Sequence, residues 1–166
     1  MPKPRPPLSR ALFDIVPKVI SERKVLPWTL DSIASAFNNP KREENVNLRA
    51  EHRSVDEASG FPVTLTLHFA ISGAPKYPDS WNISLLLYNV RIDGFGYERT
   101  FRDIHGSKCC GWHRHAWNPE TLSGEGKIPA GDWPADPDKM TVTEFLARAF
   151  REMNVCYEDN YDNDLL

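Results

Sequence analysis

A strict alternation of apolar and polar residues between positions 63 and 71 constrains the fold more than any other feature of the sequence. Its apolar members are Val63, Leu65, Leu67, Phe69 and Ile71. Alternate side chains of a β-strand point to the same face, so this segment predicts a strand with one buried face. Residues 46–55 alternate more weakly, and residues 81–92 are densely apolar, which is typical of a central strand covered on both faces.

Turn residues divide the next segment into further strands. Asp93–Gly96 has the composition of a hairpin turn, after which Tyr97–Ile104 is expected to return as a strand. His105–Lys108 forms a second turn before a strand at Cys110–Trp117. Residues 118–140 are rich in glycine and proline and predict a long ordered loop. The pattern predicts an antiparallel meander sheet of four to five strands.

Helices are expected on both sides of this sheet segment in the chain. A short helix is predicted before Pro17, and Thr29 has the character of an N-cap for a helix over residues 30–37. Thr141 and Glu144 have the spacing of a capping box, which predicts a final helix packed on one face of the sheet. The predicted fold class is therefore α+β, with short N-terminal helices and a C-terminal helix.

Length and charge bound the organisation of the chain. We expect a single domain over residues 1–166, with flexible ends at residues 1–8 and 158–166. The sequence contains no apolar run long enough for a membrane span and no signal-peptide core, which predicts a cytoplasmic protein. Because the net charge is -3, a nucleic-acid partner would require a local basic patch.

The segment 111–117 concentrates the groups that can carry chemistry. His113 and His115 lie two residues apart on a predicted strand, so their side chains should share a face about 6 to 7 Å apart. A four-residue turn at 105–108 would pair His113 with Thr100 and His115 with Glu98, leaving Arg102 on the same face. A slip of one residue would bring Arg99, Phe101 and Asp103 there instead. Either register predicts an arginine beside the histidines.

Three interpretations of the histidine pair remain open. In the first, the two imidazoles act as general base and general acid in metal-independent cleavage of RNA, with an arginine binding the phosphate and a tryptophan stacking on a base. In the second, the pair chelates zinc for a zinc-dependent hydrolysis, with a further ligand from His105, Cys109, Cys110 or Asp103. In the third, the histidines and tryptophans form a polar and aromatic sheet face covered by the long loop.

The candidate site residues follow from these interpretations. The candidate catalytic residues are His113, His115, Arg102 and Asp103. The candidate substrate-binding residues are Arg99, Arg114, Trp112 and Trp117. The candidate metal ligands are His105, His113 and His115. Only the zinc interpretation requires a cofactor.

Several short motifs resemble the TumE-like family of toxins from prokaryotic toxin–antitoxin pairs. They are Tyr97 to Asp103, His105-Gly106, His113-Arg114-His115 and the final helix that begins at Thr141. The resemblance covers roughly residues 81 to 155. It implies a compact α+β fold, a toxic activity directed at nucleic acid and a cognate antitoxin, and it nominates His113 and His115, with Asp103 and Gly106 as turn positions. The N-terminal helical region, the long segment between His115 and Thr141 and the adjacent cysteines depart from the family pattern.

A function of a different class is also compatible with the sequence. The chain could be a non-catalytic inhibitor or immunity-type partner in a prokaryotic or phage conflict system, which would bind another protein through its acidic charge and its long loop. The leading expectation is a toxin-like or defence-related protein that acts on RNA or another nucleic acid.

Overall fold

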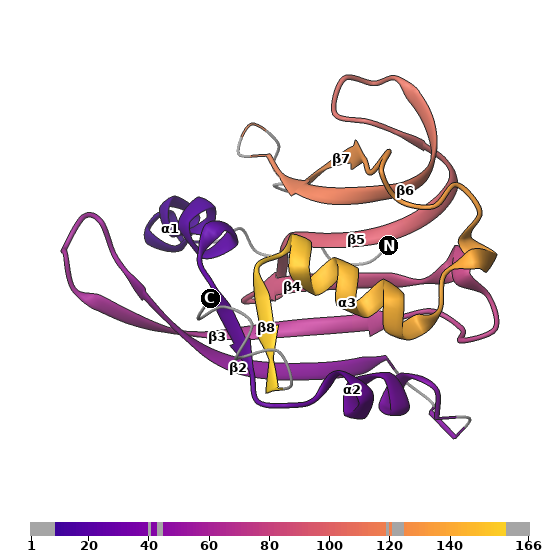
Figure 1. The fold of residues 1–166 in the computed structure, drawn as a ribbon. Coiled ribbons are helices and arrows are strands. Elements are labelled where there is room, and N and C mark those ends of the chain that lie inside the picture. Colours follow the sequence, from indigo (N-terminus) through magenta and orange to yellow (C-terminus); the bar gives the residue numbers. More distant parts are fainter. Residues whose placement is uncertain (1–8, 40, 43–44, 119, 121–124, 159–166) are drawn as a thin grey trace.

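The computed structural model describes residues 9–39, 41–42, 45–118, 120 and 125–158 (Figure 1). Apart from Glu158, the predicted flexible ends lie outside these residues. The described part is an α+β structure built on an antiparallel sheet, as the sequence predicts. None of its helices is long and apolar enough to cross a membrane.

The main sheet has six strands, and each strand pairs with its neighbours in the chain. Their bounds are β2 Val46–Val55, β3 Pro62–Ser72, β4 Asn82–Leu87, β5 Val90–Arg102, β6 Lys108–Trp117 and β7 Glu125–Pro129. The order β2-β3-β4-β5-β6-β7 is the predicted meander. The expected count of four to five strands was too low because β7 lies within residues 118–140, where we predicted only a loop.

The remaining elements lie outside this sheet. The helices are α1 Arg10–Ser21, α2 Leu30–Phe37 and α3 Val142–Glu152, with short 3-10 turns η1 Pro78–Ser80 and η2 Pro137–Lys139. A second, parallel sheet pairs β1 Lys24–Leu26 with β8 Val155–Tyr157. Figure 1 shows α3 and β8 in front of the main sheet, with α2 beside β2.

The predicted helix caps are confirmed, but α1 is longer than expected. Thr29 accepts a hydrogen bond from the amide of Ser32, and Thr141 with Glu144 makes a complete capping box. By contrast, α1 continues through Pro17 to Ser21. Its buried residues Ile15, Val16 and Val19 lie on both sides of the proline. Burial of this apolar face therefore outweighs the hydrogen bond that the proline removes.

The core lies between the sheet and α3, and aromatic rings fill much of it. The contacts join Phe69 to Phe150, Trp81 to Phe145, Trp112 to Phe145, and Phe95 to Trp133. These sheet residues therefore face α3. The opposite face of the sheet, which we call the open face, carries the alternate residues of each strand.

The turn between β4 and β5 differs from the prediction. It lies at Tyr88 and Asn89, which have φ values of 48° and 65°, whereas the predicted turn at Asp93–Gly96 is in the middle of β5. A Cβ atom at Gly94 would lie 2.4 Å from the carbonyl oxygen of Ile83 on β4. Gly94 is thus required for a close approach of two strands rather than for a turn.

The register between β5 and β6 also differs from both predicted registers. His113 pairs with Gly96, instead of Thr100 or a neighbour of Thr100. The connection begins at Asp103, whose Oδ1 accepts hydrogen bonds from the amides of His105 and Ser107 at 2.9 and 2.8 Å. This side chain closes an Asx-type turn two residues before the predicted turn, and a bulge between Glu98 and Phe101 shifts the register further.

Candidate functional site

His113 and His115 do share one face of β6, as the period of the strand predicts. Their ring centroids lie 4.8 Å apart, and the two planes are nearly perpendicular at 86°. Because Trp112 and Arg114 of β6 face the α3 side, the two imidazoles point to the open face. They are nevertheless only 1% and 5% exposed. The pair therefore lies in a recess rather than on a flat surface.

Glycines in β5 provide the space for this recess. Gly96 is the direct partner of His113 in the ladder. A Cβ atom at Gly94 would lie 3.4 Å from Cδ2 of His115, in addition to its clash with β4. Gly94 and Gly96, in the segment predicted as a turn, thus lie beneath the two imidazoles and leave space for their rings.

Charged side chains from two strands, β5 and β7, surround the imidazoles. Nη1 of Arg91, at the start of β5, lies 3.3 Å from Nδ1 of His115. Nζ of Lys127 on β7 lies 2.6 Å from Oε2 of Glu98 on β5. The same carboxylate oxygen lies 3.8 Å from Nε2 of His113. These five residues form a compact polar cluster on the open face.

The cluster lines a hollow of ≈ 390 Å³, which we call the histidine pocket. Its lining residues are Ser80, Trp81, Asn82, Arg91, Gly96, Tyr97, Glu98, His113, His115 and Lys127. The side chains of Lys127 and Glu98 are 32% and 43% exposed, so they lie at its mouth. The imidazoles lie deeper, where little solvent reaches them.

Burial keeps both imidazoles neutral. It lowers the pKa of His113 below 6.5, although the carboxylate of Glu98 opposes this change. Burial, together with the positive charges of Arg91 and Lys127 and the neighbouring imidazole, lowers the pKa of His115 to about 3. At neutral pH each ring therefore has one protonated nitrogen and one free lone pair.

The hydrogen-bond partners assign opposite tautomers to the two rings. A guanidinium can only donate, so Nδ1 of His115 accepts from Arg91 and its proton is on Nε2. Nδ1 of His113 faces the carbonyl oxygen of Gly111 at 3.4 Å, which can only accept, so His113 carries its proton on Nδ1. One ring offers the pocket a lone pair, and the other offers an N–H donor.

Two predicted catalytic residues do not join this cluster. Arg102 pairs with Lys108 near the end of β5, where its Nη1 donates to the carbonyl oxygen of Gly106. Asp103 holds the turn, and the amide of Ser107 is the main cause of its lowered pKa. Neither residue lines the histidine pocket. The shift in register separates both residues from the histidines.

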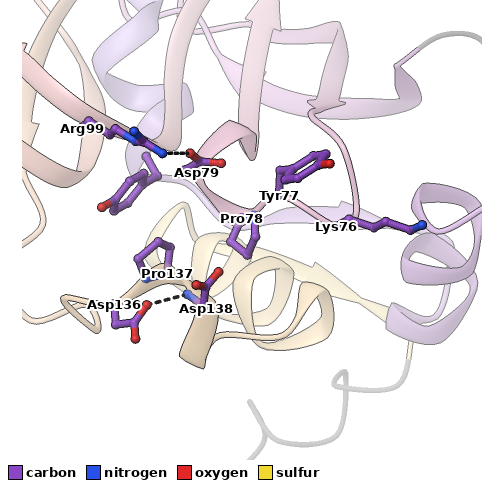
Figure 2. Close-up of a pocket in the computed structure, with 9 residues that line it drawn as sticks. Lys76, Tyr77, Pro78, Asp79, Arg99, Asp136, Pro137 and Asp138 are labelled. Carbon is purple, nitrogen blue, oxygen red and sulfur yellow. Dashed lines mark hydrogen bonds and ion pairs between the residues drawn. The ribbon is translucent and has the colours of Figure 1, made fainter.

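Arg99 lies at a different hollow, of ≈ 290 Å³, at the end of the sheet near η1 and η2. Figure 2 shows its guanidinium directed at Asp79, with the two groups 3.4 Å apart. Across the hollow, Asp136 accepts a hydrogen bond from the amide of Asp138. Arg99 is therefore paired with a carboxylate and lies apart from the histidines.

The other predicted substrate-binding residues have structural contacts. Arg114 points to the α3 side, where its Nε and Nη2 each donate to the buried carboxylate of Asp93 at 2.8 Å. Trp112 is 4% exposed and stacks near Phe145 of α3. The ring of Trp117 makes an edge contact with Phe13 of α1 at 5.2 Å. None of these three side chains lines the histidine pocket.

The predicted zinc site has no assembled ligand set. Among the described residues, no three histidine, cysteine, aspartate or glutamate side chains are grouped so that they could hold a metal ion. His105 lies exposed in the turn after β5, away from the lining of the histidine pocket. The predicted trio of His105, His113 and His115 is therefore not assembled.

The sequence interpretation missed the two cations of the pocket. Arg91 lies in the segment predicted to be a central strand, where a charged residue among apolar ones was an available signal. Lys127 lies in the segment predicted to be a loop, but it belongs to β7 and pairs with His115. One predicted register did place Glu98 beside the histidines, although next to His115 rather than His113.

We compared the chain with protein-family models, with curated proteins and with solved structures, and none of the three comparisons found a match.

Proposed function

We propose that the chain cleaves RNA at the histidine pocket without a metal ion, as a toxin-like or defence-related ribonuclease. The observation that carries this proposal is the pair of neutral imidazoles with opposite tautomers, placed beside Arg91 and Lys127 in one pocket. A proton acceptor, a hydrogen-bond donor and two cations are the groups that phosphodiester cleavage by the neighbouring 2′-hydroxyl requires.

The charge balance of the pocket favours an anionic ligand. Among the residues that line the pocket, both imidazoles are neutral, Arg91 and Lys127 are cations and Glu98 is a carboxylate. The side chain of Asn82 takes the space above Gly96, with its Oδ1 3.2 Å from the position of a Cβ atom there, so a ligand enters at the mouth beside Lys127 and Glu98. A phosphate group fits the charge of the residues that line the pocket.

His113 is the proposed general base. Its Nε2 lone pair takes the proton of the 2′-hydroxyl while the 2′-oxygen attacks phosphorus and the bond from phosphorus to the 5′-oxygen breaks. The leaving 5′-oxygen takes a proton from water at the mouth of the pocket. The carboxylate of Glu98, 3.8 Å from Nε2, stabilises the imidazolium, which then returns its proton to the solvent. The products are a 2′,3′-cyclic phosphate and a free 5′-hydroxyl.

His115 has a different proposed role from the general acid that the sequence suggested. Its pKa of about 3 leaves it neutral, so it has no surplus proton to give at neutral pH. Its Nε2–H can instead donate a hydrogen bond to a phosphate oxygen, together with the guanidinium of Arg91 and the ammonium of Lys127. These groups would stabilise the negative charge that develops on the phosphorane.

The test is cleavage of a fluorescently labelled RNA oligonucleotide in the presence of EDTA. Wild-type protein should release products with a 2′,3′-cyclic phosphate end, and a 2′-deoxy oligonucleotide should stay intact. His113→Gln should lower kcat by about 10²- to 10⁴-fold, as expected for loss of a general base. The exposed His105→Gln is the matched control and should retain activity.

The pH dependence of the rate shows whether His115 is a hydrogen-bond donor or a general acid. If His113 is the base and His115 only donates a hydrogen bond, the pKa of His113 below 6.5 predicts a rate that rises through the acidic range and then stays level to pH 8. A bell-shaped profile would instead support the original acid–base pair. Loss of activity in EDTA with recovery on zinc addition would contradict the metal-independent reaction. An equal rate for His113→Gln and wild type would remove His113 from the mechanism.

Protein binding without catalysis is a second candidate, and one observation favours it. The end of the β2–β3 hairpin projects at the left of Figure 1, where Lys18 of α1 donates to the carbonyl oxygen of Val55, and Phe61 at this end is 71% exposed. Val55 in the same hairpin end is 40% exposed. Such apolar exposure is typical of a contact surface for another protein. This candidate predicts no RNA cleavage and a protein partner, such as an antitoxin, whose binding is lost in Phe61→Ser but retained in His113→Gln.

A further inference from the structure

Strand β2 ends the main sheet and leaves one of its own edges open. Among the described strands it pairs only with β3, and it forms the lower edge of the main sheet in Figure 1. Its ten residues pair with β3 one after another without a bulge, from Val46 with Ile71 to Val55 with Pro62, and none of the ten is a proline. A long, regular edge of this kind is a template for a further strand, because its outward N–H and C=O groups have no partner in the ladder.

The rest of the described chain leaves this edge free over positions 46–54. Apart from the ladder with β3, no backbone-to-backbone hydrogen bond between described residues involves these positions. Lys18 of α1 donates to the carbonyl oxygen of Val55, just beyond them, at 3.1 Å. Helix α2, drawn beside β2 in Figure 1, belongs to the layer on the α3 side, where the rings of Phe37 and Trp81 lie 6.5 Å apart.

Charged side chains alternate along β2 on the open face. Arg49, Glu51 and Arg53 are exposed, and none of them forms an ion pair with another described residue. The residues between them, Ala50 and His52, are at most 9% exposed and face the core. A strand that adds to this edge must therefore match charge on one face and burial on the other.

The order of the charges makes β2 complementary to a second copy of itself. In an antiparallel pair centred on Ala50, Arg49 of each copy faces Glu51 of the other. Arg53 then faces the neutral Asn47. Opposite charges directly across a ladder stabilise the pair, whereas like charges destabilise it. This register therefore contains two attractive charge pairs and no repulsive one.

Other registers are less favourable. A pair centred on Glu51 sets this carboxylate against its own copy and Arg49 against Arg53, so it is repulsive. A pair centred on His52 is attractive between Glu51 and Arg53, but it joins only positions 49–55 instead of 46–54. A shift of one residue would set exposed side chains opposite core side chains. The register centred on Ala50 thus combines the longest overlap with complementary charge.

We propose that two copies of the chain associate through β2, in an antiparallel pair centred on Ala50 that joins two six-stranded sheets into one continuous sheet. This association is independent of the proposed ribonuclease function. The twofold axis of such a pair is perpendicular to the sheet, so the open faces of both copies lie on the same side. Both histidine pockets therefore open on one surface of the dimer.

Sedimentation equilibrium over chain concentrations of about 1 µM to 1 mM measures the association. Wild type should reach twice the chain mass of 18.9 kDa. Arg49→Glu and Glu51→Arg each turn two attractive pairs into two repulsive pairs, so each should raise Kd by at least about tenfold. An equimolar mixture of the two variants should dimerise as wild type does, because every charge again faces its opposite. Restored association also shows that both variants are folded.

Arg53→Glu is the matched control, with the same change of charge on the same strand. Because position 53 faces Asn47, its Kd should stay within about twofold of the wild-type value. A larger loss in Arg53→Glu than in Arg49→Glu would overturn the register. Wild type that is monomeric at every concentration, or a mixture of the charge variants that associates no better than each alone, would overturn the association.

Hydrogen exchange locates the contact on the full chain. Amides of β2 should exchange more slowly in the wild-type dimer than in monomeric Arg49→Glu, while amides of the exposed turn at 105–107 should exchange equally in both. A dimer whose β2 amides gain no protection would be formed by another surface, which would contradict the proposal.

Discussion

Acidification should destabilise the fold through His115 by an amount that the structure defines. The pKa of this imidazole is about 3 in the folded protein and 6.5 when it is free of the fold. Between these values the unfolded chain binds a proton that the folded chain does not, so stability is complete above pH 6.5 and falls as the pH is lowered. Each pH unit below 6.5 costs about 1.36 kcal/mol. At pH 5.0 the loss from this one residue is therefore about 2 kcal/mol.

Urea unfolding at pH 7.5 and pH 5.0, followed by tryptophan fluorescence, measures this loss. Other groups also titrate in this range, so the informative quantity is the difference between wild type and His115→Gln, whose side chain does not titrate. The free energy of unfolding of wild type should fall between the two pH values by about 2 kcal/mol more than that of the variant. His105→Gln, in the exposed turn, should behave as wild type.

One result would refute the reasoning about the pocket. If wild type and His115→Gln lose equal stability between pH 7.5 and pH 5.0, protonation of His115 has no cost in the fold. The ring would then be solvated or paired with a carboxylate, and its assignment as a neutral donor beside Arg91 would be wrong. A lower stability of the variant at pH 7.5 does not affect this comparison, because each protein is its own reference.

Three further predictions concern the frame around the pocket, each measured by urea unfolding at pH 7.5. Gly94→Ala should destabilise by about 1–3 kcal/mol, because its Cβ would lie 2.4 Å from the carbonyl oxygen of Ile83 and force β4 and β5 apart; unchanged stability would contradict the close approach. Tyr88→Asn should stabilise by about 1 kcal/mol, since Tyr88 is exposed and has a φ of 48°, which asparagine tolerates better; a loss of stability would show that its ring makes a needed contact. Arg114→Met should cost about 3–5 kcal/mol because it leaves the buried carboxylate of Asp93 without its ion-pair partner; a cost below 1 kcal/mol would show that this pair is not important for folding.

Elements whose signals are local were predicted well. The alternation around Leu67 and the caps at Thr29 and Thr141 depend on neighbouring residues only, and the structure has the strand and both helices. The pair of β1 and β8 had no such signal. It joins three-residue segments more than a hundred residues apart, such as Lys24 with Val155, and a parallel pair of this length has no turn to mark it.

Glycine was the least reliable guide, because the same residue serves two physical purposes. At Gly94 and Gly96 the absent side chain allows close packing within a strand, whereas the actual turn uses Tyr88 and Asn89. Both uses are consistent with a Gly-x-Gly segment between apolar runs. Only the position of β4 decides between them, and that position depends on contacts across the sheet.

In the candidate site, likewise, one part follows from local sequence and another part depends on long-range contacts. Two residues that are two apart on a strand share a face in every register, so the closeness of His113 and His115 followed from the sequence alone. Their neighbours depend on register, and a turn closed by Asp103 replaced the expected Arg102 with Arg91. That replacement changes the chemistry of the site, because Arg91 lies against Nδ1 of His115.

The chemical difference between the two histidines arises from their partners rather than from their own positions. A guanidinium that can only donate lies against Nδ1 of His115, and a carbonyl oxygen that can only accept lies against Nδ1 of His113. Burial then prevents either ring from holding a second proton at neutral pH. Two identical side chains on one strand thus become an acceptor and a donor without a charge on either. An acid–base pair would need one ring that stays protonated at neutral pH, and burial opposes a second proton on both rings despite the carboxylate of Glu98 3.8 Å from Nε2 of His113. For this reason the proposed reaction has a single histidine base, with Arg91 and Lys127 rather than a second histidine opposing the charge of the phosphate.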